Sequence, residues 1–187
     1  MGIIAMPKPA PLTLFTSTLE TPTGIMRLAT DDLGRLRFLD WEDSAVRWRP
    51  LLERLYRAAG GVRFDATQGA AWPVCDRLSA YFAGDLAAID GVPVESAGTP
   101  FQRTVWAALR RIPAGETWTY TQLAARVGRP EAVRAAGTAN GANPISVVVP
   151  CHRVIGADGA LTGYGGGIAR KQWLLAHEGV RVGRAAA

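Results

Sequence analysis

Residues 143–154 read Asn-Pro-Ile-Ser-Val-Val-Val-Pro-Cys-His-Arg-Val, and this stretch decides how the second half of the chain is built. The run Ile145–Val149 is rich in β-branched residues, which predicts a buried strand. This strand would end at Pro150 and deliver Cys151, with His152 and Arg153 directly after it. Neighbouring cationic or hydrogen-bonding groups favour the thiolate form of a cysteine, so Cys151 is a candidate nucleophile.

Cys151 also has a plainer interpretation, because free cysteines are often buried as small apolar residues. Successive side chains on a strand point to opposite faces, so His152 would reach the thiol only through a water molecule or a local kink. A loop with six glycines, Gly156–Gly167, follows and lets backbone approach a flat ligand closely. The other cysteine, Cys75, lies among apolar residues of a predicted helix and is assigned to the core.

The second half is otherwise predicted to be helical, with glycine- or proline-containing turns between its helices. The predicted helices cover residues 100–112, 119 or 121 to 127, 131–140 and 168–177. The middle two are short and are separated by the turn Gly128–Pro130, which makes them a helix-turn-helix candidate.

The first half shows the pattern of a small α/β domain. Its predicted elements are the strands Leu12–Thr18, Ile25–Thr30 and Arg35–Leu39, and helices from Ser44 to Arg57 and from Pro73 to Ala83. The turn signal at residues 31–34 makes the last two strands a hairpin. The expected organisation is a flexible leader (1–10), an α/β domain (11–90), a linker (91–99), a helical domain (100–180) and a tail (181–187).

Composition narrows the possible functions. The 187 residues are 48% hydrophobic and 20% charged, which is typical of a globular protein. No apolar run approaches membrane-spanning length, and the N-terminus makes a poor secretory signal, so we expect a cytoplasmic protein without a membrane partner. Residues 98–187 carry eleven Lys and Arg against four Asp and Glu, which favours a polyanionic partner such as nucleic acid.

The few cysteines and histidines limit the chemistry further. There are two of each, and no Cys-x-x-Cys or His-x-x-x-His pair occurs. A disulfide framework is excluded, and a zinc site would need most of the four to converge. We therefore expect no metal and no cofactor.

Several spaced motifs resemble the O6-alkylguanine-DNA alkyltransferases, and specifically the bacterial Ogt-like members. The resemblance rests on Pro-Cys-His-Arg-Val at 150–154 with Asn-Pro before it at 143–144 and Gly-Tyr-Gly-Gly-Gly after it at 163–167. It extends over Phe-Gln at 101–102, Ile-Pro-Ala-Gly-Glu-Thr at 112–117, Tyr-x-x-Leu-Ala at 120–124, Arg-Ala-Ala-Gly at 134–137 and Glu-Gly at 178–179. These motifs span the basic half, whereas the acidic half agrees in the size and order of its elements.

The resemblance implies a ribonuclease H-like α/β domain followed by a helical domain with a helix-turn-helix. It also implies direct repair: an alkyl group moves from the O6 atom of guanine, or the O4 atom of thymine, to a cysteine in an irreversible, single-use reaction. By motif position, Cys151 would be the acceptor, His152 the base acting through water, and Glu178 the group that orients His152.

The same resemblance implies roles in handling double-stranded DNA through its minor groove. Tyr120 would help flip the target nucleotide and donate to the N3 atom of guanine, and Arg134 would fill the vacated stack. Flipping a base costs a few kcal/mol, so such a plug is physically required. The small residues Ala135, Ala136 and Gly137 would let the helix approach the groove, although ordinary helix packing explains them too.

Four further residues would shape the pocket. Asn143 would be the hinge between the helix-turn-helix and the active-site strand, although a simple turn before Pro144 explains it equally well. Tyr164 would line the guanine pocket, and the carbonyls of Cys151 and Val154 would accept from the guanine amino group. Gly165 stands where some members have Ser, which suggests a roomier loop that tolerates alkyl groups larger than methyl.

Three alternatives belong to other classes of protein. A damage-binding relative without catalysis would lack the cysteine, which is present here. A helix-turn-helix regulator would need base-reading side chains, whereas residues 131–140 offer mainly one Arg and small residues. A hydrolase using Cys151, His152 and Glu178 would turn over repeatedly. The leading expectation is a monomeric repair protein, with cooperative binding to DNA left open.

Overall fold

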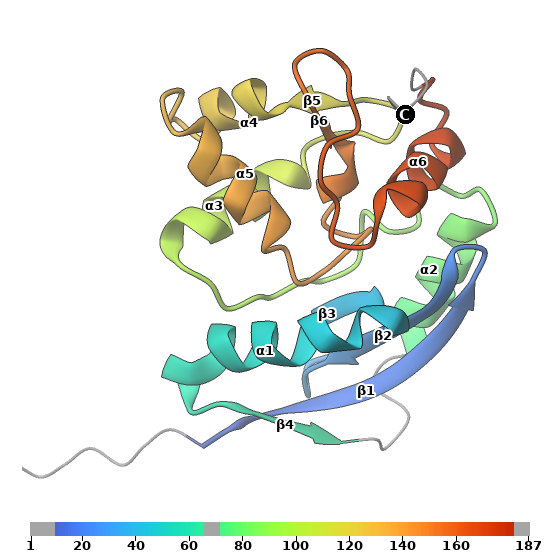
Figure 1. The fold of residues 1–187 in the computed structure, drawn as a ribbon. Helices are drawn as coiled ribbons and strands as arrows, with labels where there is room; N and C mark the ends of the chain where they lie inside the picture. Colours follow the sequence, from blue (N-terminus) through green and yellow to red (C-terminus); the bar gives the residue numbers. More distant parts are fainter. Residues whose placement is uncertain (1–9, 66–71, 182–187) are drawn as a thin grey trace, which may run out of the picture.

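A computed structural model describes residues 10–65 and 72–181 (Figure 1). The first half contains one four-stranded sheet in the order β3-β2-β1-β4. Its strands are β1 (Leu12–Thr21), β2 (Gly24–Thr30), β3 (Leu36–Trp41) and β4 (Val62–Asp65). The first three pair antiparallel, which confirms the predicted hairpin, and β4 joins β1 in parallel. The four residues of β4 are too few to show an alternating pattern, so this strand cannot be predicted from the sequence.

Two α-helices accompany this sheet. They are α1 (Ala45–Tyr56), between the short 3₁₀ helices Glu42–Ser44 and Arg57–Ala59, and α2 (Trp72–Phe82). Apolar residues of α1 such as Leu52 pack on the sheet against Phe38 and Leu14. The helix over residues 44–57 is confirmed, but Ser44 caps it by position alone, because its side chain makes no capping hydrogen bond.

The second half is mainly helical, as predicted. Its elements are α3 (Pro100–Leu109), β5 (Trp118–Thr119), α4 (Tyr120–Arg126), α5 (Val133–Gly141), the 3₁₀ turn Cys151–Arg153, β6 (Val154–Ile155) and α6 (Ile168–His177). Reciprocal side-chain and backbone hydrogen bonds between Thr119 and Gln122 form a capping box, which places the start of α4 at Thr119 rather than Thr121. The second helix of the pair starts at Val133, two residues later than predicted.

The predicted strand over Ile145–Val149 is wrong. This segment makes a single bridge from Ile145 to Leu39 and otherwise turns on itself. Val149 N–H donates to the Ile145 carbonyl at 3.1 Å, and Val147 has φ 69°, a left-handed conformation that is strained for a β-branched residue. Local turns and the Asn143 side chain supply hydrogen-bond partners for backbone N–H and C=O groups that would otherwise need a neighbouring strand.

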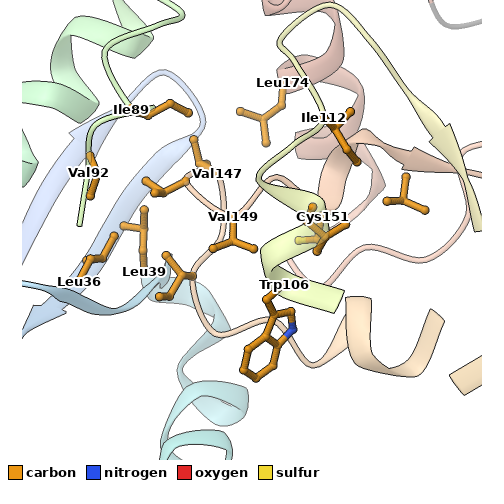
Figure 2. Close-up of a cluster of buried hydrophobic side chains, with 14 of the residues drawn as sticks. Leu36, Leu39, Ile89, Val92, Trp106, Ile112, Val147, Val149, Cys151 and Leu174 are labelled. Carbon is orange, nitrogen blue, oxygen red and sulfur yellow. The ribbon is translucent and has the colours of Figure 1, made fainter. Parts of the chain in front are cut away.

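This turning segment joins the two halves of the molecule. Leu39 N–H donates to the Pro144 carbonyl at 3.0 Å, and Ser146 N–H donates to the Leu39 carbonyl at 2.7 Å. Figure 2 shows one cluster of buried side chains that runs from Leu36 and Leu39 on β3, through Val147 and Val149, to Cys151. The sheet therefore supports the loop that leads to Cys151. Among the described helices, none is long and apolar enough to span a membrane.

Candidate active site

Cys151 opens a 3₁₀ turn rather than following a strand, and its side chain is buried. Asn143 Nδ2 lies 3.1 Å from Cys151 Sγ and donates to the Val149 carbonyl at 2.8 Å, while Asn143 Oδ1 accepts from Ile145 N–H at 3.0 Å. The Asn143 amide thus holds the turn in place and presents an N–H to the sulfur, an arrangement that favours the thiolate. A turn also replaces the strand geometry that set His152 on the face opposite Cys151.

The next two residues of the turn meet one buried carboxylate, that of Glu178. His152 Nε2 lies 3.0 Å from Glu178 Oε1, and Arg153 donates to Oε1 through Nη2 and to Oε2 through Nε, both at 2.8 Å. Burial alone would raise the pKa of Glu178, but the hydrogen bonds and charges of His152 and Arg153 outweigh it and lower the pKa far below its usual range. Glu178 is therefore a carboxylate at neutral pH. Arg153 Nη1 also donates to the Ile112 carbonyl.

The surroundings of His152 suit a general base. Burial lowers the pKa of His152 and outweighs the opposing effect of Glu178, while the charges of Arg153 and Lys171 lower it further. The imidazole is therefore neutral near pH 7. Because Nε2 faces a carboxylate, it carries the proton, which leaves the lone pair on Nδ1. Within the described residues, Nδ1 has no hydrogen-bond partner.

A small pocket opens beside the thiol. It is lined by Asn140, Gly141, Asn143, Ser146 and Cys151, and by Gly163, Tyr164 and Gly165 of the glycine-rich loop. This arrangement brings together the predicted residues Asn143, Tyr164 and Gly165. Burial of the Tyr164 hydroxyl raises its pKa, so the phenol stays protonated and able to donate. Nothing in the sequence marks Asn140 or Ser146 as functional, because both sit inside patterns that indicate secondary structure.

The two carbonyls expected to bind guanine already have donors within the chain. Lys171 Nζ, fully buried, donates to the Val154 carbonyl at 2.6 Å and to the Thr162 carbonyl at 2.9 Å. The Cys151 carbonyl accepts from Val154 N–H and from Asn140 Nδ2 at 3.4 Å. A carbonyl oxygen has two lone pairs, so the Cys151 carbonyl already has its full number of donors, and a guanine amino group would have to displace one of them, such as the long bond from Asn140 Nδ2. Lys171 thereby ties the glycine-rich loop to the residues that follow Cys151.

Lys171 gives a pH-dependent prediction. Burial lowers its pKa from 10.5 to about 8, so between these values the unfolded chain binds more protons than the folded one. The free energy of unfolding contributed by this residue should therefore rise with pH across that window. In urea unfolding, the difference between wild type and Lys171→Met should grow from about pH 8 to about pH 10. A constant difference would contradict the lowered pKa.

The residues of the predicted helix-turn-helix lie on α4 and α5, and the end of α5 also contributes Asn140 and Gly141 to the pocket beside Cys151. Tyr120 is the first residue of α4, and a Cβ added to Gly137 would meet its ring at 3.5 Å, so the glycine allows α5 to pack closely on Tyr120. Arg134 and Ala135 are exposed on α5, whereas Ala136 is buried in the core. The outward face of α5 thus presents an arginine beside a small residue. No group of three or more potential metal ligands occurs among the described His, Cys, Asp and Glu residues.

A buried thiol with an amide donor, a histidine of the same turn paired with a buried glutamate, and two short helices joined by a turn are the features that we expect of a DNA-binding protein with a reactive cysteine. The family model for the 6-O-methylguanine DNA methyltransferase DNA-binding domain matches residues 100–180. The methylated-DNA--protein-cysteine methyltransferase of Salmonella typhimurium is 52% identical over 168 residues, which cover 90% of this chain and 97% of that protein. The enzyme of the same name from Mycobacterium tuberculosis strain H37Rv is 46% identical, over 84% of this chain and 88% of its own. The chain belongs to the methylated-DNA--protein-cysteine methyltransferase family.

Solved structures agree with this assignment. The crystal structure of Mycobacterium tuberculosis OGT in complex with DNA superposes with a TM-score of 0.73 at 40% sequence identity, covering 88% of this chain and 92% of that one. The O6-methylguanine-DNA methyltransferase of Pyrococcus kodakaraensis, at 24% identity and a TM-score of 0.64, shares the fold.

Proposed function

We propose that this protein repairs DNA by moving an alkyl group from the O6 atom of guanine, and from the O4 atom of thymine, to Cys151. The observation that carries the proposal is the Cys151 turn: one side of the thiol meets the Asn143 amide, and the next residue, His152, is paired with buried Glu178. The family assignment and the relative solved with DNA support the same conclusion.

The reaction is a direct displacement at carbon. His152 Nδ1 takes the Cys151 proton through a water molecule, and Glu178 stabilises the resulting imidazolium. The thiolate attacks the alkyl carbon, an S–C bond forms as the C–O6 bond breaks, and the electron pair leaves on the guanine. Tyr120 supplies a hydrogen bond or proton to the guanine N3 atom. A thioether does not hydrolyse, so each molecule acts once.

Access to the base requires that the nucleotide leave the stack. The exposed Arg134 on α5 fills the gap, and Ala135 and Gly137 let the helix approach through the minor groove. Tyr120, which packs against Gly137, crowds the phosphate of the flipped nucleotide. Tyr164 and Gly165 line the pocket beside the thiol that would receive the base. Gly165 places no side chain there, which should leave room for alkyl groups larger than methyl.

Arg134→Ala tests this division of roles. Because the flipped state of a duplex loses its plug, repair of duplex O6-methylguanine should slow by about 10- to 100-fold, from the few kcal/mol that extrusion costs. Reaction with free O6-benzylguanine, which needs no flipping, should change less than twofold. Single-turnover rates on both substrates decide the matter, and equal losses would remove Arg134 from this role.

The function as a whole is tested by intact mass before and after incubation with an oligonucleotide that carries one O6-methylguanine. The expected result is a gain of one methylene per protein molecule, mapped to Cys151, which stops at one equivalent. Lesion-selective binding without a change in mass would instead support a damage-binding protein. Repeated turnover of substrate would support a hydrolase.

We propose the domain boundaries with the function. The sheet order, with β4 parallel to β1, supports a ribonuclease H-like domain over residues 11–90, and α3 to α6 support a helical DNA-binding domain over 100–180. Between them, the Glu95 N–H donates to the Leu36 carbonyl, so this connection runs along the sheet edge. We propose a monomer, because all the groups proposed for the reaction lie in one chain, and we propose the cytoplasm as its location.

A further inference from the structure

Tyr81, on α2 of the N-terminal half, reaches the carboxylate that pairs with His152. Its hydroxyl donates to Glu178 Oε1 at 2.7 Å, and its side chain is fully buried. Figure 1 shows α2 lying near α6, at whose end Glu178 is placed. The oxygen that accepts from Tyr81 is the same one that meets His152, so these two residues share Oε1 while Arg153 spans both oxygens.

Packing between α2 and α6 fixes the position of the Tyr81 hydroxyl. The Tyr81 carbonyl accepts from His177 Nε2 at 2.8 Å, and the Tyr81 ring lies edge-on to the rings of His177 and Phe82, with centroids 5.1 and 5.2 Å away. Phe82 in turn lies against Trp173 of α6. The phenol is therefore held at Glu178 by several contacts, independently of the hydrogen bond itself.

The chemistry of a shared oxygen gives Tyr81 an effect on His152. Burial and the negative charge of Glu178 raise the pKa of Tyr81, so the phenol remains a donor at any working pH. A hydrogen bond donated to a carboxylate takes up part of its negative charge. The carboxylate then makes weaker hydrogen bonds and weaker charge interactions with its other partners. The His152 imidazolium is one of those partners.

We propose that Tyr81 is a positioning residue of the alkyl-transfer site, which fixes Glu178 Oε1 against His152 and limits how strongly Glu178 makes His152 basic. Through Tyr81, the N-terminal half thereby takes part in the proton relay. This inference rests on the proposed role of His152 as the base.

Among the described groups that face His152, Glu178 is the one that favours its charged form. Arg153 and Lys171 both disfavour a second positive charge, and the ring of Tyr164 lies edge-on at 6.4 Å. Glu178 raises the pKa of His152, whereas burial, Arg153 and Lys171 lower it. A change in the negative charge that Glu178 presents to His152 therefore shifts this pKa directly. His177 touches Tyr81 at its carbonyl and its ring rather than at its hydroxyl.

Two substitutions with opposite expected effects test the proposal. Tyr81→Phe removes the hydroxyl and should raise the pKa of His152, moving the acid limb of the alkyl-transfer rate upward by about half a pH unit. The loss of a fixed Oε1 should also lower the plateau rate roughly fivefold. Replacing Tyr81 with 3-fluorotyrosine keeps the shape, makes a stronger donor, and should move the acid limb downward.

The measurements are single-turnover rates over about pH 5 to about pH 9 on free O6-benzylguanine, together with an NMR titration of the His152 imidazole assigned from a His152→Gln sample. The matched control is Tyr56→Phe, which changes a buried tyrosine at the end of α1, in the separate cluster with Leu14 and Phe38, and should leave both profiles unchanged. Affinity for duplex DNA should stay within twofold in all variants.

Coincident His152 titration curves for wild type, Tyr81→Phe and the fluorinated protein would overturn the proposal and reduce Tyr81 to a packing residue. If Tyr81→Phe fails to fold, the fluorinated protein alone decides, because it retains every contact. If wild type never alkylates Cys151, the proposed function fails, whereas the His152 titrations still decide the role of Tyr81.

Discussion

Cys151→Ala should abolish alkyl transfer completely, with no gain in mass after prolonged incubation with O6-methylguanine DNA. In the proposed reaction the new bond forms on the Cys151 sulfur, and neither Asn143 nor His152 can replace it as a lasting acceptor. The side chain removed is small and sits at the edge of the core, so the fold should persist and binding to alkylated duplex should remain. The measurement pairs intact mass with a binding titration.

Cys75→Ala provides the matched control. Cys75 is half-buried on α2, and burial raises the pKa of its thiol, so it is a poor nucleophile. This variant should gain the same methylene as wild type. Transfer that survives in Cys151→Ala and disappears in Cys75→Ala would mean that the acceptor is wrongly assigned.

Glu178→Gln should have the largest effect on stability. The substitution keeps the shape but leaves the buried Arg153 guanidinium without its carboxylate, and breaking a buried pair in this way costs about 3–5 kcal/mol. The same change removes the charge that stabilises the His152 imidazolium, so alkyl transfer should fall by about 100-fold or more. Urea unfolding and single-turnover rates measure the two effects.

The pH dependence of this difference follows from the lowered pKa of Glu178. A carboxylate with a lowered pKa in the folded state contributes stability that is complete above its unfolded pKa, near pH 4.3, and is lost as the pH falls below it. In a His152→Gln background, where no imidazole titrates beside the carboxylate, the stability cost of Glu178→Gln should thus be constant from about pH 8 to about pH 5 and shrink in more acidic solution. Arg153→Met serves as control, because it removes the other member of the pair. A difference that grows on acidification would contradict the assignment.

The sequence by itself determined the local elements whose signals lie within a few residues. Capping residues such as Thr99 and Thr119, stop signals such as Gly179, and the turn at residues 31–34 all act through nearby backbone, and the helices and hairpin they predicted are present. The motifs around Cys151 and Glu178 identified the family for the same reason, since they are runs of adjacent residues. The pairing of His152 with Glu178, implied by that resemblance, is present in the structure.

Tertiary structure decided the conformation around Cys151. The β-branched run Ile145–Val149 predicted a strand, but strand propensity mostly reports how well a residue fits a half-buried sheet surface. Here the Asn143 amide and the edge of β3 supply backbone hydrogen bonds to this run in place of a strand ladder. Val147 adopts a strained conformation that no local preference would select, because contacts from both halves hold it.

The contribution of the N-terminal half was likewise invisible in the sequence. Tyr81 and Glu178 are 97 residues apart, and nothing in the apolar pattern of α2 distinguishes a core tyrosine from one that donates to a buried carboxylate. Lys171 looks like an ordinary surface lysine until the fold buries it against two carbonyls. A sequence fixes which donors and acceptors exist, but which of them meet at long range depends on how packed elements exclude water around them.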